Sequence, residues 1–214
     1  MYDNVFVGKN ANKQPKRILI LGESHYEEDG KIDGTDGVVK HLAINENDKD
    51  TQFYKNIMRT FGYEITEENR KRFWNKVYCG NYIDDPCGKG KDNPASKKVK
   101  EKDKNTKIEN RTKYNNSLFE FINENEIDIV FCFSRLVYNN LPGFAKGESE
   151  EMPIKHKTQY LKRFTYKSNS AHKKCDIQLK KPVIVYGLKH PSSSYSYKIY
   201  YEQYFKDEKD SIGL

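Results

Sequence analysis

Four residues with polar groups follow a buried strand near the start of the chain: Glu23, Ser24, His25 and Tyr26. The strand is indicated by the four aliphatic residues from Ile18 to Leu21, which end at Gly22. A strand that is apolar at every position is buried on both faces, as in a parallel sheet covered by helices. Ligands bind beyond the carboxyl ends of the strands in such sheets. We therefore expect the chemistry of this chain here, although an ordinary polar turn would give the same pattern.

Two later apolar stretches also end in polar residues. The stretch 127–133 is followed by Ser134 and Arg135, and the stretch 182–188 is followed by Lys189-His190-Pro191-Ser192. The carboxyl ends of parallel strands lie at one edge of a sheet, so these exits are expected near Glu23.

The elements that must position these residues are strands that alternate with helices. Strands are predicted at 18–21, 77–83, 127–133 and 182–188. Helical spacing follows Thr51, which is a capping residue, and again follows Thr66; further helices are predicted at 118–122, 136–141 and 197–205. Gly62 is expected to end the first of these helices. The alternation predicts an α/β fold, a three-layer α/β/α sandwich with a mostly parallel four-stranded sheet.

The length of 214 residues favours a single domain over residues 1–214. Residues 27–50 have no hydrophobic period and are expected to form a long loop over the end of the first strand. The segment 87–113 is almost free of apolar residues, and 144–181 is basic and irregular, so both are expected to be mobile insertions. In the second insertion, lysines alternate with Tyr160, Phe164 and Tyr166, a mixture that suits a strand of nucleic acid.

The charge indicates an anionic partner. The formal net charge is +7 and 32% of the residues are charged, which favours nucleic acid as the partner. No apolar stretch approaches the roughly 18 residues of a membrane span, and the first residues lack a signal peptide. We expect a cytoplasmic monomer that does not bind a membrane.

The cysteines give no signal for a disulfide framework or a zinc knuckle, because the chain contains no C-x-x-C pair. Cys79, Cys87, Cys132 and Cys175 are expected to be free thiols. A metal or cluster shared by Cys79 and Cys87 is the alternative, although metal ligands usually come in tighter pairs. The histidines form no helical metal motif either. Neither a metal nor another cofactor is expected.

Taken together, the three strand exits resemble motifs of the uracil-DNA glycosylase superfamily. Its members carry G-Q-D-P-Y-H or G-E-A-P-G after the first strand and H-P-S near the C-terminus. This chain has Gly22-Glu23 followed by Tyr26, and His190-Pro191-Ser192 matches the second motif completely. The segment 53–57, Phe-Tyr-Lys-Asn-Ile, also looks like the S-L-x-N-I helix start of some branches. The resemblance covers the ordered core and leaves both basic insertions unmatched.

Three positions depart from the family motifs. His25 replaces the proline of the first motif, Ser24 replaces the aspartate that positions water in one branch, and Ser134 or a neighbour replaces the asparagine that recognises uracil. The resemblance therefore implies a DNA glycosylase that hydrolyses the N-glycosidic bond of uracil, or of another modified base, after the base is flipped out of DNA.

The same resemblance assigns a role to most residues of the site, whereas His25 has no counterpart in the family and is expected to contact the base or a phosphate. Glu23 would orient or deprotonate the attacking water, and His190 would stabilise the departing base anion. The base would be held by Gly22, Ser24, His25, Tyr26, Phe53 and Ser134. The DNA would be contacted by Lys189, Ser192, Ser193 and Tyr195, with Tyr195 as the wedge that fills the place of the flipped base.

Two other functions fit the same sequence. The chain could be a catalytically inactive nucleic-acid-binding module that kept the fold and the basic groove. It could also be a hydrolase of a small nucleotide or nucleoside. Substitution of Glu23 separates an enzyme from a binder, and competition by duplex DNA separates a DNA enzyme from a nucleotide hydrolase.

Overall fold

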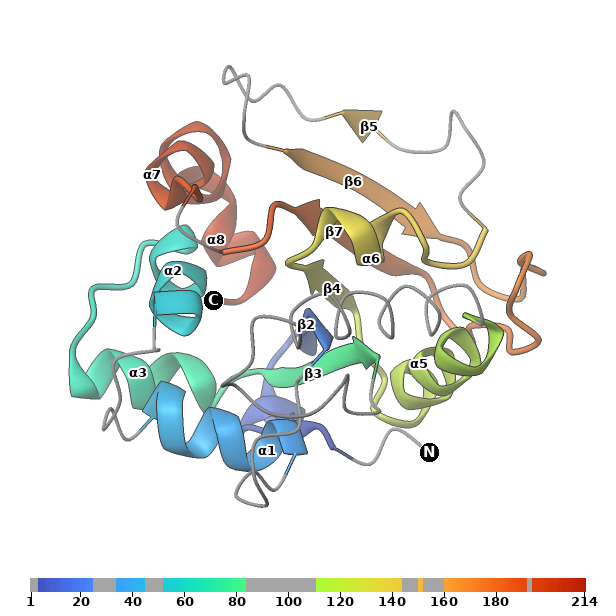
Figure 1. Cartoon of the computed structure of the whole chain (residues 1–214), viewed down its shortest axis with the longest axis horizontal. Helices are drawn as coiled ribbons and strands as arrows, with labels where there is room; N and C mark the ends of the chain where they lie inside the picture. The colour runs from blue at the N-terminus through green and yellow to red at the C-terminus, as the bar shows by residue number, and fades with distance from the viewer. Residues whose placement is uncertain are drawn as a thin grey trace, which may run out of the picture.

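The strands within the described residues form one seven-stranded mixed sheet in the order β1-β3-β2-β4-β7-β6-β5 (Figure 1). The structure, a computed structural model, describes residues 4–24, 34–44, 52–83, 111–143, 150–151, 160–191 and 194–214. The strands are β1 (Phe6–Val7), β2 (Ile18–Ser24), β3 (Tyr78–Ile83), β4 (Ile129–Cys132), β5 (Glu150–Glu151), β6 (Leu161–Tyr166) and β7 (Val183–Leu188).

The helical segments alternate with these strands along most of the chain. They are η1 (Ala11–Lys13), α1 (Gly34–Val38), η2 (Val39–Ile44), α2 (Gln52–Thr60), α3 (Glu67–Trp74), α5 (Thr112–Glu124), α6 (Arg135–Tyr138), α7 (Tyr197–Tyr200), η3 (Tyr201–Phe205) and α8 (Lys206–Ile212). None of the helices within the described ranges is long and apolar enough to cross a lipid bilayer.

The α/β class predicted from the sequence is confirmed, and the four predicted strands are the central part of the sheet. β3, β2, β4 and β7 are neighbours in that order, and each pairs in parallel with the next. The prediction of four strands in total is wrong, because β1, β6 and β5 extend the sheet in antiparallel orientation. Short β1 and β5 were missed because two residues give no hydrophobic period.

The strand β6 corrects the prediction that 144–181 is irregular throughout. Leu161, Phe164 and Tyr166 are buried, whereas Thr165 between the two aromatic residues is exposed. All six residues of β6 pair with β7, from Leu161 opposite Leu188 to Tyr166 opposite Val183. An antiparallel strand near the edge of a sheet can bury one face and leave the other in water, so its basic residues do not prevent it from forming.

Residues 34–44 correct the prediction of a long loop over 27–50, because α1 and η2 form there. Val39 and Ala43 are buried, and they pack in the same cluster as α2 and α3. The four-residue spacing of these two apolar side chains is too short a pattern to indicate a helix from the sequence. The rest of 27–50, apart from 34–44, lies outside the described residues.

The helix α2 agrees with its predicted position. Its last turn is followed by Gly62, whose φ of 78° lies in the left-handed region that favours glycine. A Cβ atom at this position would lie 2.3 Å from the Tyr201 ring, so the close packing of η3 also requires glycine here. The helix α3 begins after Thr66, as predicted, and Thr66 caps it, since the Asn69 amide donates to Oγ1 of Thr66.

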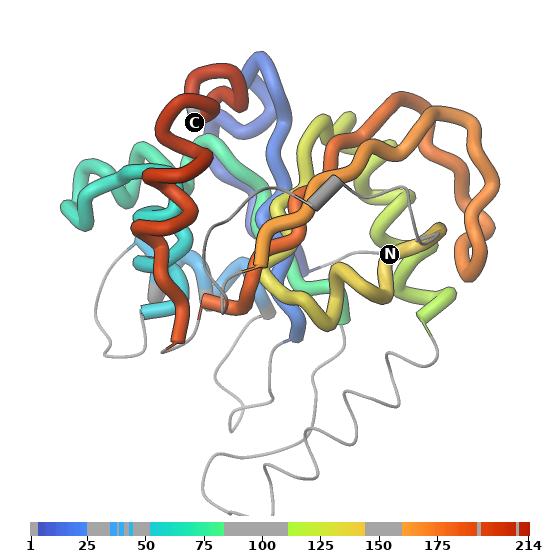
Figure 2. Tube along the Cα trace, turned by 90° about the horizontal axis from the view of Figure 1, so that it is seen from above, coloured from blue at the N-terminus to red at the C-terminus, as the bar shows by residue number. Residues whose placement is uncertain are grey.

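The sheet separates two hydrophobic cores, as a three-layer arrangement requires. On one side, buried residues of α2, α3 and the C-terminal helices pack against Ile18, Ile20 and Phe131. On the other side, buried residues of α5 and α6 pack against Leu19 and Leu21. Figure 2 shows the C-terminal helices beside α2 at one flank, and α5 with the segment after β6 at the opposite flank.

The first predicted insertion ends earlier than expected. Residues 111–113 lead into and begin α5, a helix that was predicted to start near residue 118. The remaining part of 87–113 lies outside the described residues. Tyr114 and Asn115 are buried, and the Tyr82 hydroxyl donates to Oδ1 of Asn115 at 2.8 Å. These contacts attach the start of α5 to the end of β3.

Candidate functional site

Glu23 and Ser134 form the central contact at the carboxyl edge of the parallel strands. Leu21 of β2 pairs with Cys132 of β4, so Glu23 and Ser134 lie side by side two residues further on. The Ser134 Oγ donates a hydrogen bond of 2.5 Å to Oε1 of Glu23. Short hydrogen bonds of this kind are typical of a hydroxyl and an ionised carboxylate. The sheet therefore fixes one carboxylate oxygen of Glu23.

The role predicted for Ser134 as a direct base contact does not fit its surroundings. Ser134 is 0% exposed and caps α6, because its Oγ accepts a hydrogen bond of 3.2 Å from the Val137 amide. With the hydroxyl used by Glu23 and Val137, Ser134 has no hydrogen left for a ligand. Ser134 is a positioning residue for Glu23, and no feature of the sequence distinguished this role from substrate contact.

A buried thiol lies beneath the same contact. Cys132 is fully buried, and its Sγ donates to the Ser134 carbonyl oxygen at 3.4 Å. Burial raises the pKa of this thiol, and the negative charge of Glu23 raises the pKa further. Cys132 is consequently a protonated packing residue and not a nucleophile.

Gly22 allows a close approach between β2 and β3. It pairs with Asn81, and a Cβ atom at Gly22 would lie 2.4 Å from the Asn81 Oδ1. The Asn81 Nδ2 donates to Oγ1 of Thr35 at 3.1 Å, which joins α1 to the sheet beside Glu23. Gly22 therefore makes room for a side chain, and Asn81 is a polar residue of this edge that the sequence analysis did not select.

His190 lies at the same edge of the sheet, two strands away from Glu23. Cys132 pairs with Gly187 of β7, so Lys189 is level with Ser134, and the Cα atoms of Glu23 and Lys189 are separated by about 10 Å across the sheet. The His190 ring lies 5.2 Å from the Phe53 ring of α2. The two residues predicted to be catalytic are thus brought to one edge by segments far apart in sequence.

The side chains of Glu23 and His190 are directed to different sides of the sheet. Glu23 contacts Ser134 at the start of α6, whose buried residues belong to the core that includes Leu21. His190 contacts Phe53 of α2, which packs on the opposite core. Side chains alternate between the faces of a strand, so this divergence follows from their positions. A substrate touched by both residues must lie across the edge of the sheet.

The segment after β7 is held by contacts with α2 and α7. The Asn56 Nδ2 donates to the Pro191 carbonyl oxygen at 3.5 Å, and the Lys189 amide donates to the Tyr200 hydroxyl at 3.3 Å. The Lys189 Nζ donates to the Ser194 carbonyl oxygen at 3.1 Å, which folds its side chain back over its own loop. Asn56 belongs to the S-L-x-N-I resemblance, and here it orients the H-P-S segment.

The role predicted for Tyr195 as a DNA wedge does not fit its position in the fold. Tyr195 is only 8% exposed, and its ring stacks on Tyr200 with the centroids 4.9 Å apart. Its hydroxyl forms a hydrogen bond of 2.7 Å with Oγ1 of the fully buried Thr60. Tyr195 is a core residue that joins the H-P-S loop to α2.

The structure describes only some of the other residues that were predicted to contact the base or the DNA. Ser24 ends β2 opposite Ile83 and is half-buried, as is Phe53. The predicted contacts His25, Tyr26, Ser192 and Ser193 lie outside the described residues, as does Cys87. Cys79, Cys132 and Cys175 are free and buried, as expected for thiols that form no disulfide framework.

A cluster of cations around Tyr160 lies next to this edge. The Arg135 guanidinium lies 5.3 Å from the centroid of the Tyr160 ring, and the Lys162 Nζ lies 5.7 Å from it. Arg135 begins α6 directly after Ser134, and Tyr160 immediately precedes β6. We call these three residues the Tyr160 cluster. The alternation of cations and aromatics in 144–181 indicated Tyr160 and Lys162, but not their contact with Arg135 after β4.

Comparisons with known proteins do not add a relative to this description. No protein-family model matches the chain, and no curated protein matches it significantly. The resemblance to the uracil-DNA glycosylase superfamily therefore rests on the motifs of this sequence.

Proposed function

We propose that this protein is a DNA glycosylase that hydrolyses the N-glycosidic bond of a uracil or another modified base flipped out of DNA. The observation that carries the proposal is the hydrogen bond from Ser134 to Glu23, which holds a carboxylate at the carboxyl edge of the parallel strands. Open α/β sheets bind their ligands at that edge. A carboxylate at the position of Glu23 can activate water.

The proposed reaction needs one group on each side of the sugar. Glu23 orients or deprotonates the water that attacks the anomeric carbon, and its charge stabilises the oxocarbenium-like transition state. His190 donates a hydrogen bond to the departing base and stabilises the negative charge that develops on it. The sugar then lies across the edge of the sheet, between two side chains that come from opposite faces.

The Tyr160 cluster supports nucleic acid as the substrate. Arg135 is exposed and Lys162 is half-buried, and both lie over one aromatic ring beside the start of α6. Cations can pair with phosphates while aromatic rings stack on bases, and this combination tolerates many sequences. The net charge of +7 agrees with such a partner.

One observation favours the second candidate, a nucleic-acid-binding module without catalysis. The residue at the position of the family's base-recognising asparagine, Ser134, is fully buried and engaged by Glu23 and Val137. A site without the contact between this residue and the base retains the basic surface but recognises a base less well.

A panel of oligonucleotides tests the proposal. The protein is incubated with duplexes and single strands that carry uracil, hydroxymethylated or glucosylated cytosine, hypoxanthine, or alkylated bases, and alkali-labile abasic sites are then measured. The proposal expects cleavage at one or more of these bases. Binding of DNA without an abasic product on any of them would favour the module without catalysis.

A further inference from the structure

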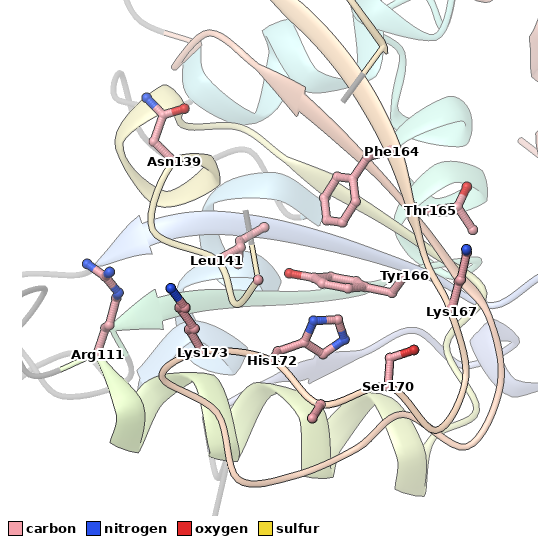
Figure 3. A pocket seen from close by; sticks show the side chains of 12 residues that line it. Arg111, Asn139, Leu141, Phe164, Thr165, Tyr166, Lys167, Ser170, His172 and Lys173 are labelled. Atoms are coloured by element: carbon pink, nitrogen blue, oxygen red, sulfur yellow. The ribbon is translucent and has the colours of Figure 1, made fainter. Parts of the chain in front are cut away.

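A pocket of about 590 Å³ opens on the α5 side of the sheet, and Glu23 is not one of its lining residues. Its wall combines the end of β6, the segment 170–173 and the loop after α6 (Figure 3). Tyr166 at the end of β6 is paired with Val183 at the beginning of β7, whereas Glu23 lies in the last part of β2, toward the carboxyl ends of the parallel strands. Pockets that bind small organic ligands commonly have volumes of about 300–1,000 Å³.

The charges around this pocket have one sign. Arg111, Lys167 and Lys173 are among its lining residues, and none of the lining residues that the structure describes is an aspartate or a glutamate. Figure 3 shows Arg111 and Lys173 at one end of the pocket and Lys167 at the other. Neither lysine forms an ion pair with a carboxylate in the described part of the chain. Such an arrangement favours a ligand that carries negative charge.

The floor of the pocket is aromatic. Phe164 and Tyr166 are buried, with ring centroids 4.5 Å apart, and the half-buried His172 ring lies 5.0 Å from Tyr166 (Figure 3). Polar groups of Asn139, Thr165 and Ser170 are also present around the cavity. An inorganic anion would leave these aromatic and neutral polar groups unused, whereas a phosphorylated ligand with a planar ring would contact them.

Hydrogen bonds and close packing hold the wall in place without a ligand. The Tyr166 hydroxyl donates to the Pro142 carbonyl oxygen at 2.7 Å, and the Arg111 guanidinium donates to Oδ1 of Asn140 at 2.9 Å. Gly143 has a φ of 69°, and a Cβ atom there would lie 2.2 Å from Nδ1 of His172. The loop after α6 is therefore fitted closely to the aromatic floor, and little ordering is needed on binding.

The pocket is joined to the Tyr160 cluster through Asn139. Asn139 lines the pocket, and its Oδ1 accepts a hydrogen bond of 3.3 Å from the Tyr160 hydroxyl. Tyr160 in turn lies under Arg135 and Lys162 at the edge of the sheet. Basic and aromatic groups thus extend from the edge of the sheet to the pocket.

We propose that this pocket binds a phosphorylated nucleoside, with the phosphate near Arg111 and Lys173 and the nucleobase against the floor formed by Phe164, Tyr166 and His172. The ligand is either a free nucleotide or one nucleotide unit of a nucleic-acid strand, since both present the same groups. This binding requires no catalysis and does not use Glu23.

Calorimetric titration of the full chain tests the proposal. The ligands are adenosine 5′-monophosphate, adenosine, inorganic phosphate and a short single-stranded DNA. The variants are Lys173→Glu and the double variant Lys167→Glu/Lys173→Glu, because both lysines are exposed. Lys180→Glu is the control: it has the same charge change as Lys173→Glu, is also exposed and lies in the same connection between β6 and β7, but it does not line the pocket. Circular dichroism establishes that each variant is folded.

The proposal expects the unaltered protein to bind the nucleotide, the single strand or both. Lys173→Glu lowers that affinity at least about tenfold, since a charge-assisted contact is replaced by a repulsive one. The double variant loses more, and Lys180→Glu stays within about twofold. Adenosine and inorganic phosphate each bind at least about tenfold more weakly than the better ligand, because each lacks one half of the contacts. Binding of the nucleotide identifies a free ligand, and binding of the single strand alone identifies a nucleic-acid unit.

Three outcomes would overturn the proposal. They are no binding of either phosphorylated ligand at millimolar concentration, an equal loss in Lys180→Glu and Lys173→Glu, or binding of adenosine or phosphate as tightly as the better ligand. Glu23→Gln is expected to retain the binding in full, so a failure here and a failure of the glycosylase proposal are separate results.

Discussion

The Ser134 Oγ donates a 2.5 Å hydrogen bond to Oε1 of Glu23, although the two residues are 111 positions apart in the sequence. Parallel pairing of β2 with β4 makes the contact possible, because it brings the last residues of β2 level with the residues that follow β4. The contact gives Glu23 a fixed orientation at the edge where parallel sheets bind their ligands.

Replacing Ser134 by alanine tests this positioning role. Ser134→Ala removes both the hydrogen bond to Glu23 and the cap of α6, and the loss of a cap alone costs about 1 kcal/mol of the free energy of unfolding. We expect the rate of base release to fall with little change in the affinity for DNA. Denaturant titration and single-turnover kinetics measure the two effects.

Ser134→Thr is the matched control for Ser134→Ala, because threonine keeps the hydroxyl and is also a good cap. It should recover much of the stability and of the rate. Equal rates in Ser134→Ala and the unaltered protein would show that the contact with Glu23 has no catalytic consequence.

Tyr195→Phe tests the assignment of Tyr195 to the core. The substitution keeps the ring stacked on Tyr200 but removes the hydrogen bond between the Tyr195 hydroxyl and the buried Thr60 hydroxyl, which still donates to the Asn56 carbonyl oxygen. The free energy of unfolding should fall by about 1–2 kcal/mol, the usual cost of a lost buried hydrogen bond. DNA affinity and base release should not change once the protein is folded. A large loss of DNA binding in a stably folded variant would restore Tyr195 as a DNA contact.

Burial of Cys79 predicts a loss of stability in alkaline solution. Burial raises the pKa of this thiol from its ordinary 9.0 to about 12. Below pH 9 the thiol is protonated in both the folded and the unfolded chain, so its contribution is fully present. Between pH 9 and 12 only the unfolded chain loses the proton, and stability falls as the pH rises.

Denaturant titration at two pH values measures this effect. Between pH 8 and pH 10.5, Cys79 should account for a decrease of about 2 kcal/mol in the free energy of unfolding. Cys79→Ala should show a correspondingly smaller decrease, since it lacks the ionisable group. The same pH dependence in both proteins would contradict the raised pKa of Cys79.

The Tyr160 cluster predicts a change in the salt dependence of DNA binding. If Arg135 contacts a phosphate, Arg135→Gln should weaken binding and reduce the slope of log K against log salt by about one. Lys206→Gln is a suitable control, because Lys206 is exposed on α8 and its substitution removes one positive charge, as Arg135→Gln does. Fluorescence anisotropy at several salt concentrations gives both slopes. Equal slopes for the two variants would exclude Arg135 as a specific phosphate contact.

The central parallel strands could be predicted because their signal is local. Ile18–Leu21 is apolar at every position, and the polar residues begin immediately after it. The strand β6 was not recognised, because Lys162 and Arg163 interrupt its apolar pattern and only the ladder with β7 explains why it forms. Tertiary pairing, and not local propensity, decides such strands.

The candidate site was predictable in its place but not in its contacts. The strand ends identified Glu23, Ser134 and His190, and the structure brings all three to one edge. Ser134 is buried because it starts α6, and Tyr195 is buried because it stacks on Tyr200. The spacing of residues in the sequence reveals neither contact. The direction of His190 toward Phe53 likewise follows from the packing of α2.

The most direct test of the account is the rate of base release by Glu23→Gln. This substitution keeps the size of the side chain and the acceptor for Ser134 but removes the charge that activates water. Single-turnover measurement on the preferred substrate of the panel should show a rate at least about a hundredfold lower, with DNA affinity nearly unchanged. A variant that releases the base as fast as the unaltered protein would contradict the proposed role of Glu23.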